Sequence, residues 1–167
     1  MEKNFKQLMR EIKALVFDID GVLTDGSLML FENGELGRSF NTKDTYAIRR
    51  ASDAGLITAV ISYASTDNLR GRLQSVGMKE VYLHCTDKKE KLGEFCLAYD
   101  LDPSTVLFMG DDLPDLQAML SCGLPVCPAD AAHEIKAICP YVSPYPGGRA
   151  CVRDVIEQVL RVQGKWE

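Results

Sequence analysis

The chain has 167 residues, of which 46% are hydrophobic and 26% are charged. This balance predicts one domain, residues 1–167, with a real hydrophobic core, and it excludes a disordered chain. The net charge of −5 argues against nucleic acid as the main partner. No apolar stretch approaches the roughly 20 residues of a membrane span, so no membrane partner is expected. The six cysteines are scattered, and with no signal peptide in view they predict reduced thiols and a cytoplasmic location.

Apolar runs and turn residues divide the chain into strands and helices. A first buried strand is predicted over 13–17, and Asn33-Gly34 between two apolar runs predicts a β-hairpin insertion over about 27–41. From residue 56 on, strands alternate with helices, which predicts an α/β fold: a parallel sheet with helices on both faces. The other predicted strands are 56–61, 81–83, 106–109, 124–127 and 141–142. The predicted helices are 43–54, 66–74, 88–99, 113–121, 131–137 and one after Gly147, while 4–12 is a short helix or an extended lead-in.

Two acidic clusters follow predicted buried strands. Asp18 and Asp20 come directly after the first strand, and Asp111, Asp112 and Asp115 follow a later one. Because ligands of open α/β sheets bind at the carboxyl ends of the strands, both clusters are expected at one site. Either cluster alone is compatible with simple helix capping. Two clusters on strand ends of one sheet favour a hard divalent cation, and Mg²⁺ is the cation that leaves room for substrate oxygens.

Two further residues are expected at the same edge of the sheet. Ser62 ends a predicted strand, and Lys88 opens a predicted helix. A hydroxyl, an ammonium group, helix N-terminal N–H groups and Mg²⁺ together form a cradle for a phosphoryl group. Taken singly, Ser62 would be a loop residue and Lys88 a solvated surface charge, so the functional interpretation depends on the acidic clusters beside them.

These four segments, in this order, resemble the motifs of the haloacid dehalogenase-like superfamily. Asp18-Ile-Asp-Gly-Val-Leu-Thr24 is similar to the first motif, Ser62 stands at the second, Lys88 at the third, and Gly110-Asp-Asp-Leu-Pro-Asp115 is similar to the fourth. The resemblance covers nearly the whole chain. It implies a Rossmann-like core and Mg²⁺-dependent phosphoryl transfer through an aspartyl-phosphate.

The resemblance also implies catalytic roles. Asp18 is the expected nucleophile, and the Asp20 side chain is the expected general acid for the leaving group and then base for water. Ser62 and Lys88 are expected to hold the phosphate, with Lys88 also pairing with Asp18. An acid at Asp20 favours a phosphatase or phosphomutase, because dehalogenases of the superfamily lack it and its pumps have Thr there.

The same motifs imply three metal ligands: the Asp18 carboxylate, the backbone carbonyl of Asp20 and the Asp111 carboxylate. Asp115 and Asp112 are not expected to bind the metal directly but to hold these ligands in position. The motif spacing leaves no room for a cap domain, so either the substrate is large or a neighbouring subunit covers the site. The apolar hairpin, residues 28–40, is the expected assembly surface.

A finer resemblance points to the 3-deoxy-D-manno-octulosonate 8-phosphate phosphatase family, which is capless and tetrameric. It rests on Thr24-Asp-Gly26, the hairpin, Lys43-Asp44 and the segment from Gly147 to Arg153. It implies a small phosphorylated sugar acid as substrate, a homotetramer and a role in lipopolysaccharide biosynthesis. The candidate substrate-binding residues are Thr24, Lys43, Asp44, Tyr63, Arg149 and Arg153. The alternative for the two arginines is that they are solvated charges at a helix start.

Three departures from this family's pattern lie on the sugar-binding side. The chain has Ser62-Tyr-Ala-Ser65 where I-[ST]-G-R is common, Asp44-Thr45 for Asp-Gly, and Ala150-Cys-Val-Arg153 for Gly-Ala-Val-Arg. They leave the phosphatase chemistry intact and leave the identity of the sugar open. Our hypothesis is that Tyr63 fills the space of the missing Arg and shifts preference among eight- and nine-carbon sugar acids.

We therefore predict a Mg²⁺-dependent sugar-acid phosphatase, with 3-deoxy-D-manno-octulosonate 8-phosphate as the first candidate substrate. One alternative is a phosphatase of nonulosonate 9-phosphates. Two alternatives are not enzymes: an inactive assembly module related to the domain fused to cytidylyl-sialate synthetases, and a phospho-accepting receiver domain. The complete acidic motifs argue against the inactive module, and Asp20 and the hairpin argue against the receiver.

Overall fold

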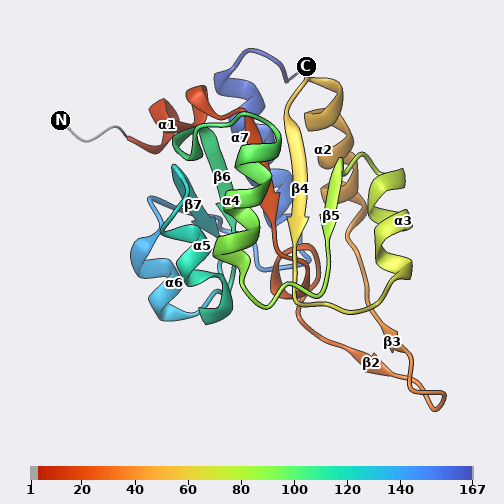
Figure 1. Ribbon diagram of the computed structural model, residues 1–167. Helices are drawn as coiled ribbons and strands as arrows, with labels where there is room; N and C mark the ends of the chain where they lie inside the picture. Colours follow the sequence, from red (N-terminus) through yellow and green to blue (C-terminus); the bar gives the residue numbers. More distant parts are fainter. Residues whose placement is uncertain (1–3, 167) are drawn as a thin grey trace.

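The computed structural model describes residues 4–166, which form a six-stranded parallel sheet between two layers of helices (Figure 1). The strand order is β5-β4-β1-β6-β7-β8, with β1 in the interior between β4 and β6. The strands are β1 (Ala14–Phe17), β4 (Ile57–Ile61), β5 (Glu80–Tyr82), β6 (Val106–Met109), β7 (Leu124–Cys127) and β8 (Tyr141–Val142). The predicted strands are thus confirmed to within a residue or two at their ends.

The two faces of the sheet carry separate hydrophobic cores. In β1, Leu15 and Phe17 belong to one core, and Ala14 and Val16 belong to the other. All four residues are buried because both faces are covered, as in other parallel sheets. The first core is closed by α1 (Phe5–Glu11), α2 (Thr42–Asp53), α3 (Asn68–Ser75) and α7 (Cys151–Val162). The second is closed by α4 (Lys88–Ala98), α5 (Leu116–Met119) and α6 (His133–Ile138).

One predicted helix is divided. The segment predicted as a single helix over 113–121 forms a short 3-10 turn, η3 (Leu113–Asp115), followed by α5. Asp112 caps the turn through the Leu113 N–H, and the Asp115 carboxylate accepts the N–H groups of Asp111 and Asp112. These local bonds favour a tight turn over a regular first helical turn. Within the second acidic cluster, the Asp115 side chain therefore turns back toward the backbone of Asp111 and Asp112.

The hairpin insertion is present and projects away from the body of the molecule (Figure 1). Its strands, β2 (Met29–Leu30) and β3 (Leu36–Gly37), are antiparallel and shorter than predicted. The Phe31 N–H donates to the Glu35 carbonyl at 2.9 Å across the turn. Met29 is 57% exposed and Leu30 is 74% exposed, so β2 presents apolar side chains that belong to neither core, while the turn at the tip, Glu32 to Glu35, is polar.

Two absences bear on the expectations from sequence. No helix in the described part of the chain is long and apolar enough to cross a membrane. The six cysteines are all free thiols, most of them buried in the two cores.

Candidate active site

Three carboxylates meet at the carboxyl edge of the sheet. Asp18 follows β1 and Asp111 follows β6, and these strands are neighbours, so their ends bring the two residues together. Asp115 reaches the same point from the turn η3. One oxygen from each of the three carboxylates lies within 4.8 Å of the others. The predicted meeting of the two acidic clusters is therefore confirmed.

Lys88 lies inside this group of carboxylates. Its Nζ is 2.9 Å from Asp18 Oδ2 and 2.6 Å from Asp115 Oδ1, and its side chain is 4% exposed. Asp87 caps α4 by accepting the Glu90 N–H at 2.9 Å, which fixes the first turn from which Lys88 extends. The alternative interpretation of Lys88 as a solvated surface charge is excluded by this burial.

The site holds more negative than positive charge. Burial raises the pKa of Asp18 to about 6, and the neighbouring Asp115 adds to the rise while Lys88 opposes it. Burial, followed by the charges of Asp115 and Asp18, raises the pKa of Asp111 to about 8. Burial alone would lower the pKa of Lys88, but the charges of Asp18 and Asp115 outweigh it and raise that pKa. A second cation among these oxygens would relieve the repulsion.

The donor set fits a hard divalent cation. The Asp115 oxygens are already engaged, one with Lys88 and the other with the N–H groups of Asp111 and Asp112. Each Asp18 oxygen has one partner, the Ile19 N–H at Oδ1 and Lys88 at Oδ2, whereas Asp115 Oδ2 accepts two N–H groups. Asp18 and Asp111 therefore keep more lone pairs for a metal, and Asp115 holds the loop behind them. Carboxylate oxygens with few protein ligands are typical of Mg²⁺ sites. Asp112 is exposed and caps η3, so it supports the loop rather than the cluster.

The loop after Asp18, η1 (Ile19–Leu23), approaches the cluster closely. Gly21 has a φ of +88°, and a Cβ at this position would overlap the Asp111 carboxylate. Only glycine satisfies both conditions. Thr24 is fully buried at the end of this loop, where its Oγ1 accepts the Gly26 N–H at 3.2 Å. The structure thus places Thr24 inside the loop and not on an open substrate surface, contrary to our expectation.

Asp20 has a partner that sequence reasoning missed. The Arg38 guanidinium, from the segment after β3, binds both carboxylate oxygens: Nε lies 2.7 Å from Oδ1 and Nη2 lies 3.1 Å from Oδ2. The Arg38 side chain is only 5% exposed. The one signal in the sequence was a basic residue on the return of the hairpin, which by itself does not identify its partner.

Ser62 lies at the end of β4, beside β1, on the same edge as Asp18. It is 2% exposed, and its Oγ accepts the Ala64 N–H at 3.2 Å. Tyr63 follows it and is 69% exposed. The structure therefore places the hydroxyl in the edge of the sheet and leaves the tyrosine ring open to an incoming molecule.

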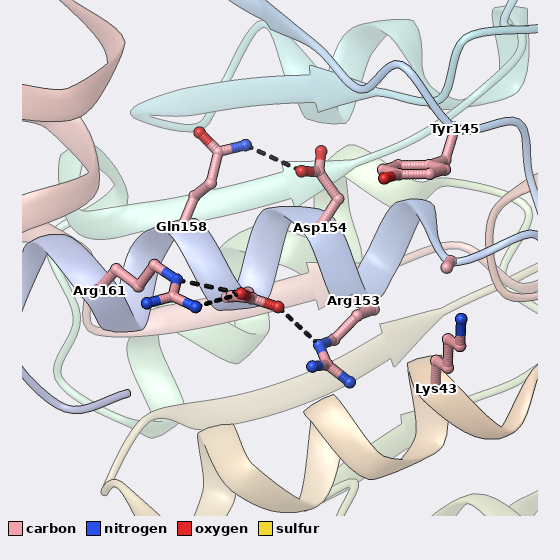
Figure 2. Close-up of a pocket in the computed structure, with 8 residues that line it drawn as sticks. Lys43, Tyr145, Arg153, Asp154, Gln158 and Arg161 are labelled. Atoms are coloured by element: carbon pink, nitrogen blue, oxygen red, sulfur yellow. Dashed lines mark hydrogen bonds and ion pairs between the residues drawn. The ribbon is translucent and has the colours of Figure 1, made fainter. Parts of the chain in front are cut away.

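Asp44 is bound to α7 within the fold, and the Arg153 side chain lines a pocket, so a role of Arg153 in substrate binding stays a prediction. Asp44 is buried, and its Oδ1 accepts the Arg153 N–H at 2.8 Å, so it caps α7 from α2. Such a cap is needed because Ala150, before α7, is left-handed and forms no side-chain cap. The Arg153 guanidinium binds Glu157 (Figure 2). It also lies over the Trp166 ring, 4.7 Å from its centroid. The packing of α2 against α7 brings Asp44 to the Arg153 N–H, which no local pattern predicts.

The other two candidate substrate residues have different surroundings. Lys43 is exposed and lines the same pocket as Arg153 and Glu157 (Figure 2). Arg149 lines a small polar pocket with Asp25. The preceding Gly148 donates its N–H to the Val22 carbonyl at 2.9 Å, which ties this segment to the loop η1. This contact holds the segment that carries Arg149 against the catalytic loop.

Comparison with known proteins agrees with this geometry. Residues 73–147 match the haloacid dehalogenase-like hydrolase family. The chain is 32% identical to the 3-deoxy-D-manno-octulosonate 8-phosphate phosphatase of Haemophilus influenzae over 160 residues, 96% of this chain and 89% of that protein. The crystal structure of the Yersinia pestis phosphatase of the same name superposes with a TM-score of 0.93 at 32% identity, covering 96% of this chain and 86% of that one.

A third relative was crystallised with its ligands. The Moraxella catarrhalis phosphatase of this name, crystallised with magnesium, phosphate and 3-deoxy-D-manno-octulosonate, superposes with a TM-score of 0.92 at 26% identity, covering 95% of this chain and 91% of that one. Magnesium is the ion that the sequence predicted for the carboxylate cluster. The predicted capless fold and enzyme class are confirmed. The chain belongs to the haloacid dehalogenase-like hydrolases and, within them, to the family of 3-deoxy-D-manno-octulosonate 8-phosphate phosphatases, which are phosphoric monoester hydrolases.

Proposed function

We propose that the chain hydrolyses 3-deoxy-D-manno-octulosonate 8-phosphate with Mg²⁺ as its cofactor. The observation that carries this proposal is the buried group of Asp18, Asp111 and Asp115 around Lys88. It has one carboxylate, Asp18, at the end of the central strand with a lysine ammonium beside it. The names of the relatives, which align over nearly the whole chain, supply the substrate.

The proposed reaction has two steps. Asp18 attacks phosphorus, the bond to the sugar oxygen breaks, and an aspartyl-phosphate forms. Asp20 gives its proton to the leaving alkoxide and then accepts a proton from the water that hydrolyses the aspartyl-phosphate. The carboxylates of Asp18 and Asp111 and the carbonyl of Asp20 would hold Mg²⁺, which would supply charge neutralisation at the phosphate.

Two residues are proposed to bind the phosphate oxygens of the substrate. Lys88 offsets the negative charge of Asp18, which keeps the nucleophile ionised at neutral pH although burial raises its pKa to about 6. With its third N–H, Lys88 is able to bind a phosphate oxygen. The Ser62 hydroxyl, at the next strand end, donates to another phosphate oxygen. Arg149 is the residue we propose to meet the sugar-acid carboxylate, because an Arg fork matches that group.

A second candidate function is hydrolysis of a nonulosonate 9-phosphate. The observation that favours it is Tyr63, which is 69% exposed directly after Ser62, where the family commonly has glycine. Its ring is positioned to contact the part of the substrate beyond the phosphate. Kinetics of Tyr63→Gly and Ala64→Arg on both esters test this point. Unchanged selectivity in both variants would exclude Tyr63 as the determinant.

The experiment that tests the proposed function is a phosphate-release assay with the octulosonate 8-phosphate, nonulosonate 9-phosphates and common hexose phosphates. Each is assayed with Mg²⁺, with chelator, and with Mg²⁺ restored, for the wild type and Asp18→Asn. We expect the highest kcat/KM on the octulosonate ester, loss of turnover with chelator, and no turnover by Asp18→Asn. Turnover of none of these esters by a folded, Mg²⁺-loaded wild type would support the inactive assembly module.

We also propose that the chain is one domain, supported by the single central sheet, and that it forms a homotetramer through the hairpin. Support for assembly comes from exposed apolar side chains on the hairpin: Leu28, Met29, Leu30 and Phe31. Leu30→Glu should shift the sedimentation profile to smaller species. Leu97→Glu, on α4, is the matched control because Leu97 is also exposed, at 84%. A cytoplasmic location stays a prediction.

A further inference from the structure

We propose that Arg38 is the positioning residue for Asp20, so that the return of the hairpin is a working part of the active site. The inference rests on the proposed function, in which Asp20 exchanges protons with the leaving oxygen and with water. No motif of the sequence indicated Arg38. It comes to this site only because the chain returns from the hairpin past the loop η1.

The contact between the two side chains is bidentate. Nε lies 2.7 Å from Oδ1 of Asp20, and Nη2 lies 3.1 Å from Oδ2. A guanidinium fork that binds both oxygens fixes the position of a carboxylate and also its rotation about the Cβ–Cγ bond. A proton-transfer group needs this restraint, because a small misplacement of a reacting group is costly in rate.

Arg38 is itself held by a second contact and by burial. The third guanidinium nitrogen, Nη1, donates to Thr66 Oγ1 at 3.3 Å, which ties Arg38 to the segment before α3. The Arg38 side chain is 5% exposed, whereas the Asp20 side chain is 33% exposed. The arginine is therefore the buried, anchored partner, and the carboxylate is the one that faces incoming molecules. This asymmetry is what a positioning role requires.

The location of Arg38 distinguishes this pair from a surface ion pair. Surface pairs between mobile side chains contribute little. Here the burial of a guanidinium beside a reactive loop is costly unless its partner is held in place. Arg38 also lines the pocket between the hairpin and α3, with Phe31, Leu36 and Leu69. Movement of the hairpin would therefore be transmitted to Asp20 through one side chain.

The first test compares two esters. Sugar esters leave as unstable alkoxides and need a proton donor, whereas 4-nitrophenyl phosphate leaves as a stable phenolate and needs little help. If Arg38 positions Asp20, Arg38→Met should lower kcat on the octulosonate 8-phosphate by about 10- to 100-fold, part of the full effect of a general acid. The kcat on 4-nitrophenyl phosphate and the KM values should change much less. Arg38→Lys should recover part of the loss, and Arg72→Met, an exposed arginine on α3, should change neither.

The double variant Asp20→Asn/Arg38→Met gives a second readout. If Arg38 acts through Asp20, the double variant should be no slower than Asp20→Asn alone. Equal losses of Arg38→Met on both esters, or additive losses in the double variant, would overturn the proposal and indicate a merely structural arginine.

A crystal structure of Arg38→Met makes the test independent of turnover. We expect the Asp20 carboxylate to adopt another rotamer or to lose defined density while Asp18 and Asp111 stay in place. An Asp20 carboxylate in the wild-type position would overturn the proposal whether or not the wild type is active. If the wild type hydrolyses neither ester while Asp20 moves in this structure, the proposed function fails and the positioning contact stands.

Discussion

Lys88→Met is the substitution that best tests the electrostatics of the site. Methionine has nearly the length of lysine and fills the same space, so the change removes a charge with little loss of packing. It leaves Asp18 and Asp115 buried without the ammonium group that lies within 3 Å of both. The control is Lys89→Met, because Lys89 is the next residue on α4 and is exposed.

The expected loss of unfolding free energy follows from the electrostatics of the buried carboxyl groups. The pKa of Asp18 rises from 3.8 to about 6 even with Lys88 present, and each pKa unit corresponds to about 1.4 kcal/mol, so ionising this group costs the fold about 3 kcal/mol. Without Lys88 this cost increases. Breaking a buried ion pair by removing one partner typically costs about 3–5 kcal/mol, and we expect a loss in this range at pH 7 for Lys88→Met.

The sign of the pH dependence is also determined. A carboxyl group whose pKa is raised in the fold destabilises the native state by an amount that is absent well below the ordinary pKa, grows between the ordinary and the raised pKa, and is constant above the raised pKa. Removal of Lys88 raises the pKa of Asp18 above about 6, so the extra cost in the variant accumulates above that pH. The difference in unfolding free energy between wild type and Lys88→Met should therefore shrink from pH 7 to pH 5. Urea unfolding without divalent cations measures it. A difference below about 1 kcal/mol, or one that does not change between these pH values, would refute the electrostatic account.

Three further predictions concern the loop, the metal and the cap of α7. Gly21→Ala should destabilise the fold by more than about 1 kcal/mol, measured by thermal melts, because φ is +88° and the added Cβ would overlap Asp111. The same variant should lose Mg²⁺ binding, measured by calorimetry. Gly55→Ala is the control: Gly55 also has a positive φ but lies in open space, so this variant has the backbone strain without the overlap. Mg²⁺ should raise the Tm more at pH 8 than at pH 6, because it binds the ionised form of Asp111, whose pKa is about 8; an equal shift in Asp111→Asn would contradict this ligand. Burial raises the pKa of Asp44 to about 6, so its ionisation destabilises the native state as pH rises from about 4 to 6. Asp44→Asn should flatten that part of the stability curve, and the exposed Asp53→Asn should not.

The central part of the site could be predicted from the sequence. An apolar run followed by an acidic residue identifies a strand end, and parallel strands place their carboxyl ends on one edge. Asp18 and Asp111 meet for this reason, together with the adjacency of β1 and β6 in the sheet. Lys88 joins these carboxylates because α4, which follows the terminal strand β5, begins at the same edge of the sheet. These are consequences of local pattern combined with a general rule of topology.

The tertiary structure alone decided the partners that come from distant segments. Arg38 binds Asp20 across 18 residues of sequence, and the Arg153 N–H binds Asp44 across 109. An isolated arginine or aspartate has no periodicity, and its partner depends on how a hairpin returns or how α2 packs on α7. Asp44 was taken for a substrate residue because its short-range context resembles a binding motif. In the structure Asp44 is buried and caps α7 instead. This burial results from the packing of α2 on α7, which depends on the folded chain and not on the sequence around Asp44.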